Sequence, residues 1–204
     1  MNPVLTAIHV TDIHLHRGWD VPARLRAAFR HIRQRHPQAT LVLNTGDTIG
    51  GLADRELTLR RYRLWDEIVA AELAGLTVHN TLGNHEMDWL PADPDAPTGI
   101  QAMVRMLKMP NRYYAFEQAG WRFLALDGWA LDKGDPAQLE WLHREIAGSK
   151  PVAILCHHPI WSMATVTVYP GDMLKSYKAM GELFGRHLNV RLDQEHTSEL
   201  QSPY

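Results

Sequence analysis

The sequence is poor in the features that mark secreted and membrane proteins. It has a single cysteine, Cys156, among 204 residues, so no disulfide can form within the chain, and a reducing, cytoplasmic setting is the simplest interpretation. The N-terminal stretch MNPVLTAIHV has no basic segment followed by a long apolar one, and so lacks the pattern of a signal peptide. No apolar run approaches the roughly 18 residues that a membrane helix requires. We therefore expect no disulfide framework and no membrane contact.

An excess of charge of either sign is also lacking. The 21 Lys and Arg residues nearly balance the 23 Asp and Glu residues, which gives a formal net charge of -2 and predicts no specific nucleic-acid partner. One basic run interleaves with Leu25, Phe29 and Ile32, which favours the solvated face of an amphipathic helix over a nucleic-acid contact. Its arginines are Arg24, Arg26, Arg30, Arg33 and Arg35.

What the chain does have is a regular alternation of apolar runs and amphipathic segments. With 45% hydrophobic residues it can build one domain with a substantial core. Strands are expected at Val4–Val10, Thr40–Asn44, Leu76–Asn80, Pro151–Cys156 and from Val190, and a hairpin turn at Ala119-Gly120. Helices are expected at Pro22–His36, Leu57–Leu73, Ile100–Leu107, Asp135–Ile146 and Met173–His187. This order predicts an α/β fold whose first half is largely parallel.

Polar side chains follow four of the expected strands. They are Asp12 and His14, then Asp47, then the GNHE stretch 83–86, then His157 and His158. Ligands in open α/β sheets bind beyond the carboxyl ends of the strands. In extended chain Asp12 and His14 would share one side and could hold one ion, while Asp47 could bridge two. Mixed carboxylate, amide and imidazole donors suit Zn, Mn or Fe.

Each of these signals is weak when it is taken alone. Asp12 could cap a turn, Gly46-Asp47 could be an ordinary turn, and His157 could be a packed histidine, since short motifs carry many false positives. Cys156 beside His157 could suggest a nucleophilic pair, but a cysteine that ends an apolar strand is better interpreted as buried and structural. All four signals in order, each after a strand, argue against chance.

In this order, the stretches DIH, GD, GNHE and HHP resemble the calcineurin-like metallophosphoesterase superfamily, over about Leu5 to Leu192. The resemblance implies two β-sheets sandwiched between helices in four layers, with two metal ions, Mn, Zn or Fe, at the strand ends. The metal ligands that it implies are Asp12 and His14 for the first ion, Asp47 for both, and Asn84 and His157 for the second.

The resemblance also implies how substrate is bound and cleaved. His85 would be catalytic, contacting the phosphate and donating a proton to the leaving oxygen, with Glu86 orienting it. Asn84 would also contact the substrate, and His158 has a substrate contact and a structural role as equal alternatives. A metal-bound hydroxide would attack the phosphoester in line. Gly50 stands where related acid phosphatases carry a tyrosine, so the chain looks more like bacterial phosphodiesterases acting on small molecules.

The sequence departs from the superfamily after the last expected strand. A Gly-His-x-His motif, which would supply two more metal ligands, is absent, and residues 193–204 form an atypical tail after a domain at 1–192. His196 could replace one ligand, a second copy of the chain in a homo-oligomer could complete the site, or the gene product could be truncated, with its closing strands missing. A rival hypothesis is therefore a catalytically impaired binding or scaffold protein with a phosphoesterase fold.

Overall fold

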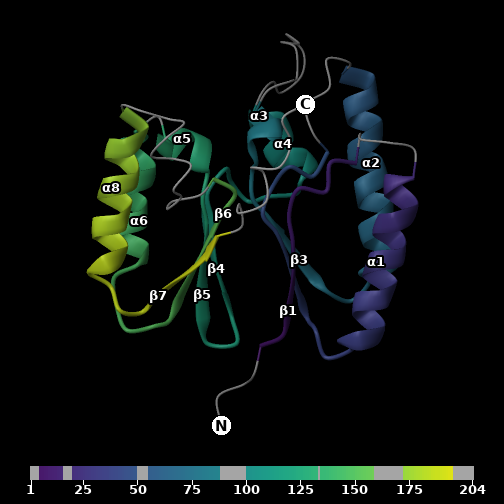
Figure 1. The fold of residues 1–204 in the computed structure, drawn as a ribbon, viewed down its shortest axis with the longest axis horizontal. Coiled ribbons are helices and arrows are strands. Elements are labelled where there is room, and N and C mark those ends of the chain that lie inside the picture. Colours follow the sequence, from purple (N-terminus) through teal and green to yellow (C-terminus); the bar gives the residue numbers. More distant parts are fainter. Residues whose placement is uncertain are drawn as a thin grey trace. The chain divides into compact units, whose positions relative to one another are not determined.

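The structure is a computed structural model, and it describes residues 5–15, 20–49, 55–87, 100–132, 134–158 and 172–194 (Figure 1). Contacts between residues divide the chain into two compact units, one at Val4–Arg112 and the other mainly at Tyr113–Tyr204. The expected division into a domain at 1–192 and a tail at 193–204 stays a prediction. The α/β fold class with two β-sheets and accompanying helices is confirmed.

The Val4–Arg112 unit is built on a parallel three-stranded sheet with the order β1-β2-β3. Its strands are β1 (Ala7–Val10), β2 (Leu41–Asn44) and β3 (Thr77–Asn80), and its helices are α1 (Val21–Arg35), α2 (Arg55–Glu72), α3 (Asn84–Met87) and α4 (Ile100–Met106). Val10, Asn44 and Asn80 end the strands in register. The three loops that follow them therefore start at the same edge of the sheet, as predicted for a ligand site.

The core of this unit explains why its elements form. All four positions of β2 are buried, as the apolar run predicted, and α1 packs on α2 through Phe29 and Trp65, whose ring centroids lie 6.3 Å apart. Both aromatic side chains are almost fully buried. Burial of each stabilises the fold by about 1.5–3 kcal/mol relative to an exposed side chain. β1 begins later than predicted because its pairing with β2 starts only at Ala7.

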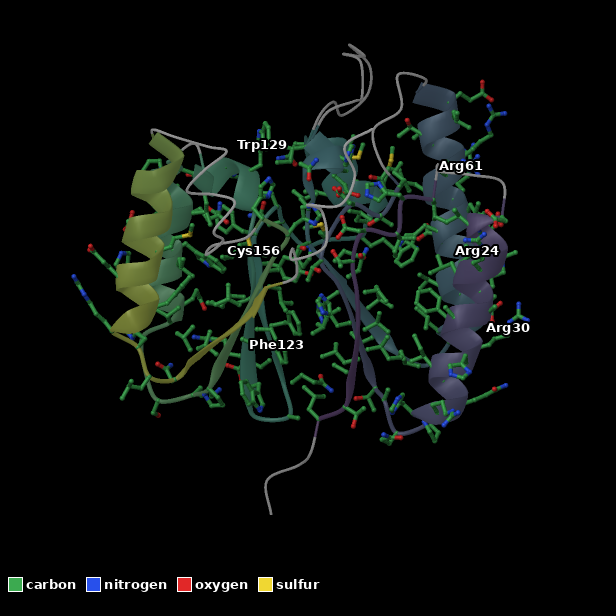
Figure 2. The ribbon with its side chains drawn as sticks, viewed as in Figure 1. Arg24, Arg30, Arg61, Phe123, Trp129 and Cys156 are labelled. Atoms are coloured by element: carbon green, nitrogen blue, oxygen red, sulfur yellow. The ribbon has the colours of Figure 1, made fainter. Side chains whose placement is uncertain are left out.

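The arginines of α1 lie on its outer surface and meet acidic or carbonyl groups (Figure 2). Arg24 pairs with Asp20, and Arg30 binds a carboxylate oxygen of Glu72 at 3.0 Å. Arg33 donates to the carbonyl oxygen of Ala74 at 2.7 Å. These contacts agree with the interpretation of the basic run as a solvated helix face that also ties α1 to the end of α2.

The second unit carries a four-stranded sheet with the order β4-β5-β6-β7. Its strands are β4 (Tyr114–Gln118), β5 (Trp121–Ala125), β6 (Val152–Cys156) and β7 (Val190–Gln194), and its helices are α5 (Gly128–Asp132), α6 (Pro136–Glu145) and α8 (Asp172–Gly185). β4 and β5 are antiparallel, whereas β5, β6 and β7 run parallel. Apolar side chains of α5, α6 and α8, among them Leu131, Leu142 and Leu183, form one core with β5 and β6.

Two local features of the second unit, a hairpin turn and a helix start, were predicted from the sequence. The predicted hairpin turn at Ala119-Gly120 is confirmed, and both residues have positive φ, 50° and 84°, as a type I′ turn requires. The predicted start of α6 is also confirmed, because the Asp135 side chain accepts hydrogen bonds from the amides of Ala137 and Gln138.

Among the described residues, no helix combines the length and apolar character needed to cross a membrane.

Candidate metal centre

The loops after β1 and β2 are joined by backbone hydrogen bonds. The amide of Asp12 donates to the carbonyl of Gly46 at 3.1 Å, and the amide of His14 donates to the carbonyl of Asp47 at 3.0 Å. These bonds place two segments that are more than thirty residues apart in sequence directly against each other. The side chains of Asp12, His14 and Asp47 therefore emerge from one shared backbone platform.

These three side chains stand on left-handed backbone. Asp12, His14 and Asp47 have φ values of 52°, 47° and 52°, a conformation that costs non-glycine residues on the order of 1–3 kcal/mol each and that concentrates at functional sites. The expectation that Asp12 and His14 share a side because the chain is extended is wrong, since β1 ends at Val10. The two side chains meet nevertheless, with His14 Nε2 3.7 Å from Asp12 Oδ1.

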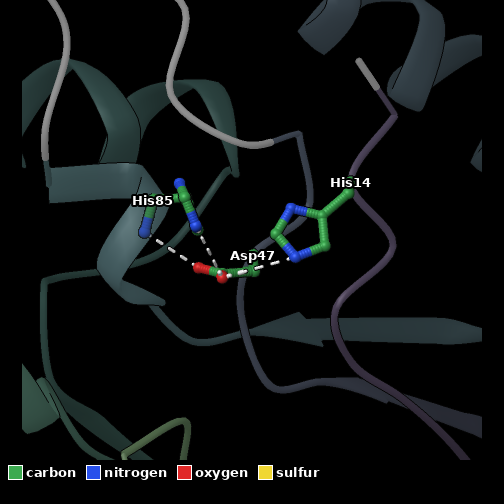
Figure 3. A group of neighbouring side chains, drawn as sticks. All are labelled: His14, Asp47 and His85. Carbon is green, nitrogen blue, oxygen red and sulfur yellow. Dashed lines mark hydrogen bonds and ion pairs between the residues drawn. The ribbon is translucent and has the colours of Figure 1, made fainter. Parts of the chain in front are cut away.

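Asp47 is the centre of the cluster (Figure 3). Its carboxylate is fully buried, and its Oδ2 lies 3.6 Å from His14 Nε2 and 3.8 Å from His85 Nε2. Ligand atoms of these three residues all lie within 4.8 Å of one another. Two imidazole nitrogens and one carboxylate oxygen form a donor set that suits Zn, Mn or Fe, so the residues present fit a metal ion.

The position of His85 differs from its predicted one in an informative way. Its ring lies edge-on to that of His14, with centroids 5.1 Å apart, and its amide donates to Asp47 Oδ1 at 2.9 Å. His85 therefore belongs to the candidate ligand cluster, whereas the resemblance implied catalysis and substrate contact for it. Its catalytic role stays a prediction.

Three residues of the GNHE stretch, Asn84 to Glu86, lie in the short helix α3. Asn84 is the first residue of α3 and is half-buried, and its roles as a metal ligand and substrate contact stay predictions. Gly83 is required for space, because a Cβ there would lie 2.1 Å from Asp47 Oδ1 and 2.4 Å from the Asp47 amide nitrogen. Gly46 instead supplies a left-handed turn, with φ 108°.

Glu86 binds backbone, not His85. Its Oε2 accepts hydrogen bonds from the amides of Asp47 at 2.8 Å and Gly83 at 2.7 Å, and its Oε1 accepts one from the amide of Thr48 at 2.7 Å. These contacts do not support the prediction that Glu86 orients the His85 side chain. Glu86 ties the loop after β2 to the loop after β3.

Two buried carboxylates close together make this region strongly negative. Burial, and secondly the Asp47 charge, raise the pKa of Glu86, although its three backbone hydrogen bonds act in the opposite direction. Burial, then the charges of Glu86 and Asp47, raise the pKa of Tyr62 in α2. A site where negative charge is this costly favours a bound cation.

His157 and His158 belong to the second unit, where they follow β6. His157 is buried, and its ring lies 5.6 Å from that of His158. His158 also lies 5.9 Å from the Trp129 ring, and a Cβ on Gly128 would come within 2.9 Å of His158 Nδ1. The Gly-Trp pair after β5 is a neighbour of His158 that the sequence analysis missed, although its place after a strand was a usable signal. Cys156 is buried, as predicted.

Comparison with known protein families identifies the family of this chain. A family model described as calcineurin-like phosphoesterase matches residues 5–195. The chain belongs to the calcineurin-like phosphoesterase family. The resemblance carried by DIH, GD, GNHE and HHP is thereby confirmed. No curated protein matched the sequence.

Solved structures share the fold of this calcineurin-like phosphoesterase at low sequence identity. A dimetal phosphatase from Danio rerio matches with a TM-score of 0.63 and 17% identity, over 92% of this chain and 79% of that chain. Phosphopantetheinyl hydrolase from Mycobacterium tuberculosis matches with a TM-score of 0.53 and 12% identity, over 98% and 85%. GAP50, the anchor in the inner membrane complex of Plasmodium, matches with a TM-score of 0.52 and 16% identity, over 85% and 63%.

Family membership supports metal-dependent phosphoester hydrolysis as the general class of activity, on small phosphoester substrates. Within the Val4–Arg112 unit, the structure brings Asp12, His14, Asp47 and His85 together. His157 and His158 stay predictions as metal ligand and substrate contact. Gly50 and His196 lie outside the described residues.

Proposed function

We propose that this chain hydrolyses small-molecule phosphoesters, with diesters preferred to monoesters, at a dinuclear centre of Mn, Zn or Fe. In this proposal Asp12 and His14 hold one ion, Asp47 bridges both, and Asn84 and His157 hold the other. The observation that carries it is the buried Asp47 Oδ2, which lies 3.6 Å from Nε2 of His14, the proposed ligand, and 3.8 Å from Nε2 of His85, the proposed acid.

The residues of the chain have separate tasks in this reaction. Bound ions would supply Lewis acidity towards the phosphoryl oxygens and the attacking water. Asp47 holds the His85 backbone through its Oδ1, at 2.9 Å, which fixes the imidazole beside the phosphoryl position. His85 then donates a proton to the leaving oxygen, and His158 binds a phosphate oxygen.

The test combines metal content with turnover. The protein is incubated with Mn, Zn or Fe, gel-filtered, and measured by elemental analysis and by hydrolysis of bis(4-nitrophenyl) phosphate and 4-nitrophenyl phosphate. We expect two ions per chain, faster diester hydrolysis, and a loss of more than about 100-fold in Asp47→Asn, beyond the range of a residue outside the ligand set. The matched control is Asp66→Asn, an exposed carboxylate paired with Lys108, which should behave as wild type.

Wild-type turnover in Asp47→Asn would contradict the proposal. So would an absence of hydrolysis across a broad phosphoester panel with the metals fully loaded.

A second candidate function is that of a scaffold that has retained the fold without catalysis. The likeness of fold to a Plasmodium protein described as an anchor supports it, as does the absence of a Gly-His-x-His motif from the sequence. It predicts metal binding below one ion per chain and no turnover. The elemental analysis above separates the two candidates.

A further inference from the structure

We infer that Glu86 is a positioning residue that sets the conformation of Asp47 and thereby the geometry of the candidate ligands. This inference rests on the proposed function insofar as it assigns Asp47 to metal binding. It concerns how the fold holds that ligand in place, which is separate from whether an ion binds.

The contacts of Glu86 are almost entirely with backbone of the two loops. Its side chain is only 2% exposed and accepts three backbone N–H groups, from Asp47, Thr48 and Gly83, at 2.7–2.8 Å. Leaving a buried backbone N–H without an acceptor is costly, so each of these bonds constrains the loops. The Glu86 carboxylate thus holds amides of the loop after β2 and an amide of the loop after β3.

These hydrogen bonds hold a segment whose left-handed backbone conformation is energetically costly. Asp47 has φ 52°, and its amide donates to Glu86 Oε2. The same Oε2 binds the amide of Gly83, the residue that lets Asp47 Oδ1 approach closely. Glu86 consequently holds the backbone of Asp47, whereas the His14 and His85 rings lie beside its carboxylate.

The variant Glu86→Gln removes one acceptor oxygen while it keeps the shape of the side chain. An amide has one acceptor oxygen and an NH₂ group that only donates, so the Thr48 amide or the Asp47 and Gly83 amides must lose their partner. We expect a drop of about 10–100-fold in affinity for Mn²⁺ measured by titration calorimetry, the range for residues that support metal ligands.

The control for lost stability is Ile68→Val, which removes one buried methylene from α2. Ile68 is fully buried, so this variant should lower the unfolding midpoint while its affinity for Mn²⁺ stays that of wild type. The control for lost charge is Glu56→Gln, since Glu56 is an exposed residue at the start of α2.

A second readout needs no metal, and its first part needs no variant. In ¹⁵N–¹H spectra of the metal-free wild type, the amide protons of Asp47, Thr48 and Gly83 should resonate downfield and exchange slowly with solvent. In Glu86→Gln at least one should move upfield. Fast exchange of all three in the wild type would overturn the inference even if Glu86→Gln failed to fold.

The two proposals fail in different ways. Equal affinity for Mn²⁺ in Glu86→Gln and wild type, or an equal loss in Ile68→Val, would overturn the positioning role while the proposed function stood. A wild type that binds none of Mn, Zn and Fe but keeps three slow, downfield amides would overturn the proposed function and leave the role of Glu86 on the backbone supported.

Discussion

Replacing Gly83 with alanine should be far more damaging than its single added methyl group suggests. The new Cβ would lie 2.1 Å from Asp47 Oδ1, 2.4 Å from the Asp47 amide nitrogen and 2.9 Å from Asp47 Cγ. Two of these atoms take part in hydrogen bonds that fix the loop, Oδ1 with the His85 amide and the nitrogen with Glu86. Asp47 therefore cannot move aside without losing them.

The magnitude follows from two costs. Overpacking a tight site costs about 1–3 kcal/mol. Loss of a hydrogen bond to a charged group adds about 1.5–3 kcal/mol. We expect Gly83→Ala to lower the free energy of unfolding by about 2.5–6 kcal/mol, which corresponds to a fall of roughly 5 °C or more in Tm for a chain of this size.

The assay is differential scanning calorimetry with Mn²⁺ titration on the same samples. The matched control is Gly185→Ala at the end of α8, where an added Cβ meets nothing within 4 Å and no left-handed φ is required. That control should stay within about 1 kcal/mol of wild type or be more stable, because alanine is the better helix former. A Tm for Gly83→Ala within about 2 °C of wild type, together with unchanged Mn²⁺ affinity, would refute the reasoning.

Three further predictions use features of the same fold. Ala119→Asn should raise the free energy of unfolding by about 0.5–1 kcal/mol in urea titrations, because asparagine tolerates the left-handed φ of 50° in the β4-β5 turn better than alanine; a loss of stability would contradict the turn assignment. Asp135→Ala should lower it by about 1 kcal/mol, because two N-terminal amides of α6 lose their acceptor, and Asp135→Asn should retain most of the stability. Mn²⁺ at about 100 times its Kd should stabilise the wild type by about 2.7 kcal/mol in thermal unfolding, and chelation should reverse this; an equal shift in Asp47→Asn would place the ion elsewhere.

The sequence predicts those parts of the fold that depend on neighbours along the chain. The apolar run at β2, the Asp-Pro start of α6 and the Ala-Gly turn each carry a local signal, and each was confirmed. The left-handed backbone at Asp12 and His14 was not predicted, since it depends on hydrogen bonds to residues of the next loop. The alternation of side chains in an extended chain correctly predicted that Asp12 and His14 lie close together, although the chain is not extended there.

The site was predictable as a set of residues but not as a set of contacts. The order of motifs identified Asp47 and His85, yet the approach of His85 Nε2 to Asp47 depends on α3, a four-residue helix too short to have a periodic pattern. Glu86 bonds to backbone 38 and 39 residues away, a partnership that no local pattern encodes. Gly83 is required because it leaves space for Asp47, a residue far away in the sequence.

The separation between Asp47 and Glu86 has a consequence for synthesis on the ribosome. A nascent chain carries β1, β2 and β3, together with Asp12, His14 and Asp47, before the carboxylate that lies 39 residues beyond Asp47 has been added. At that stage the left-handed loop of Asp47 still lacks its anchor. The ligand platform is therefore completed only after Glu86 has been added, later than every strand of the sheet on which it stands.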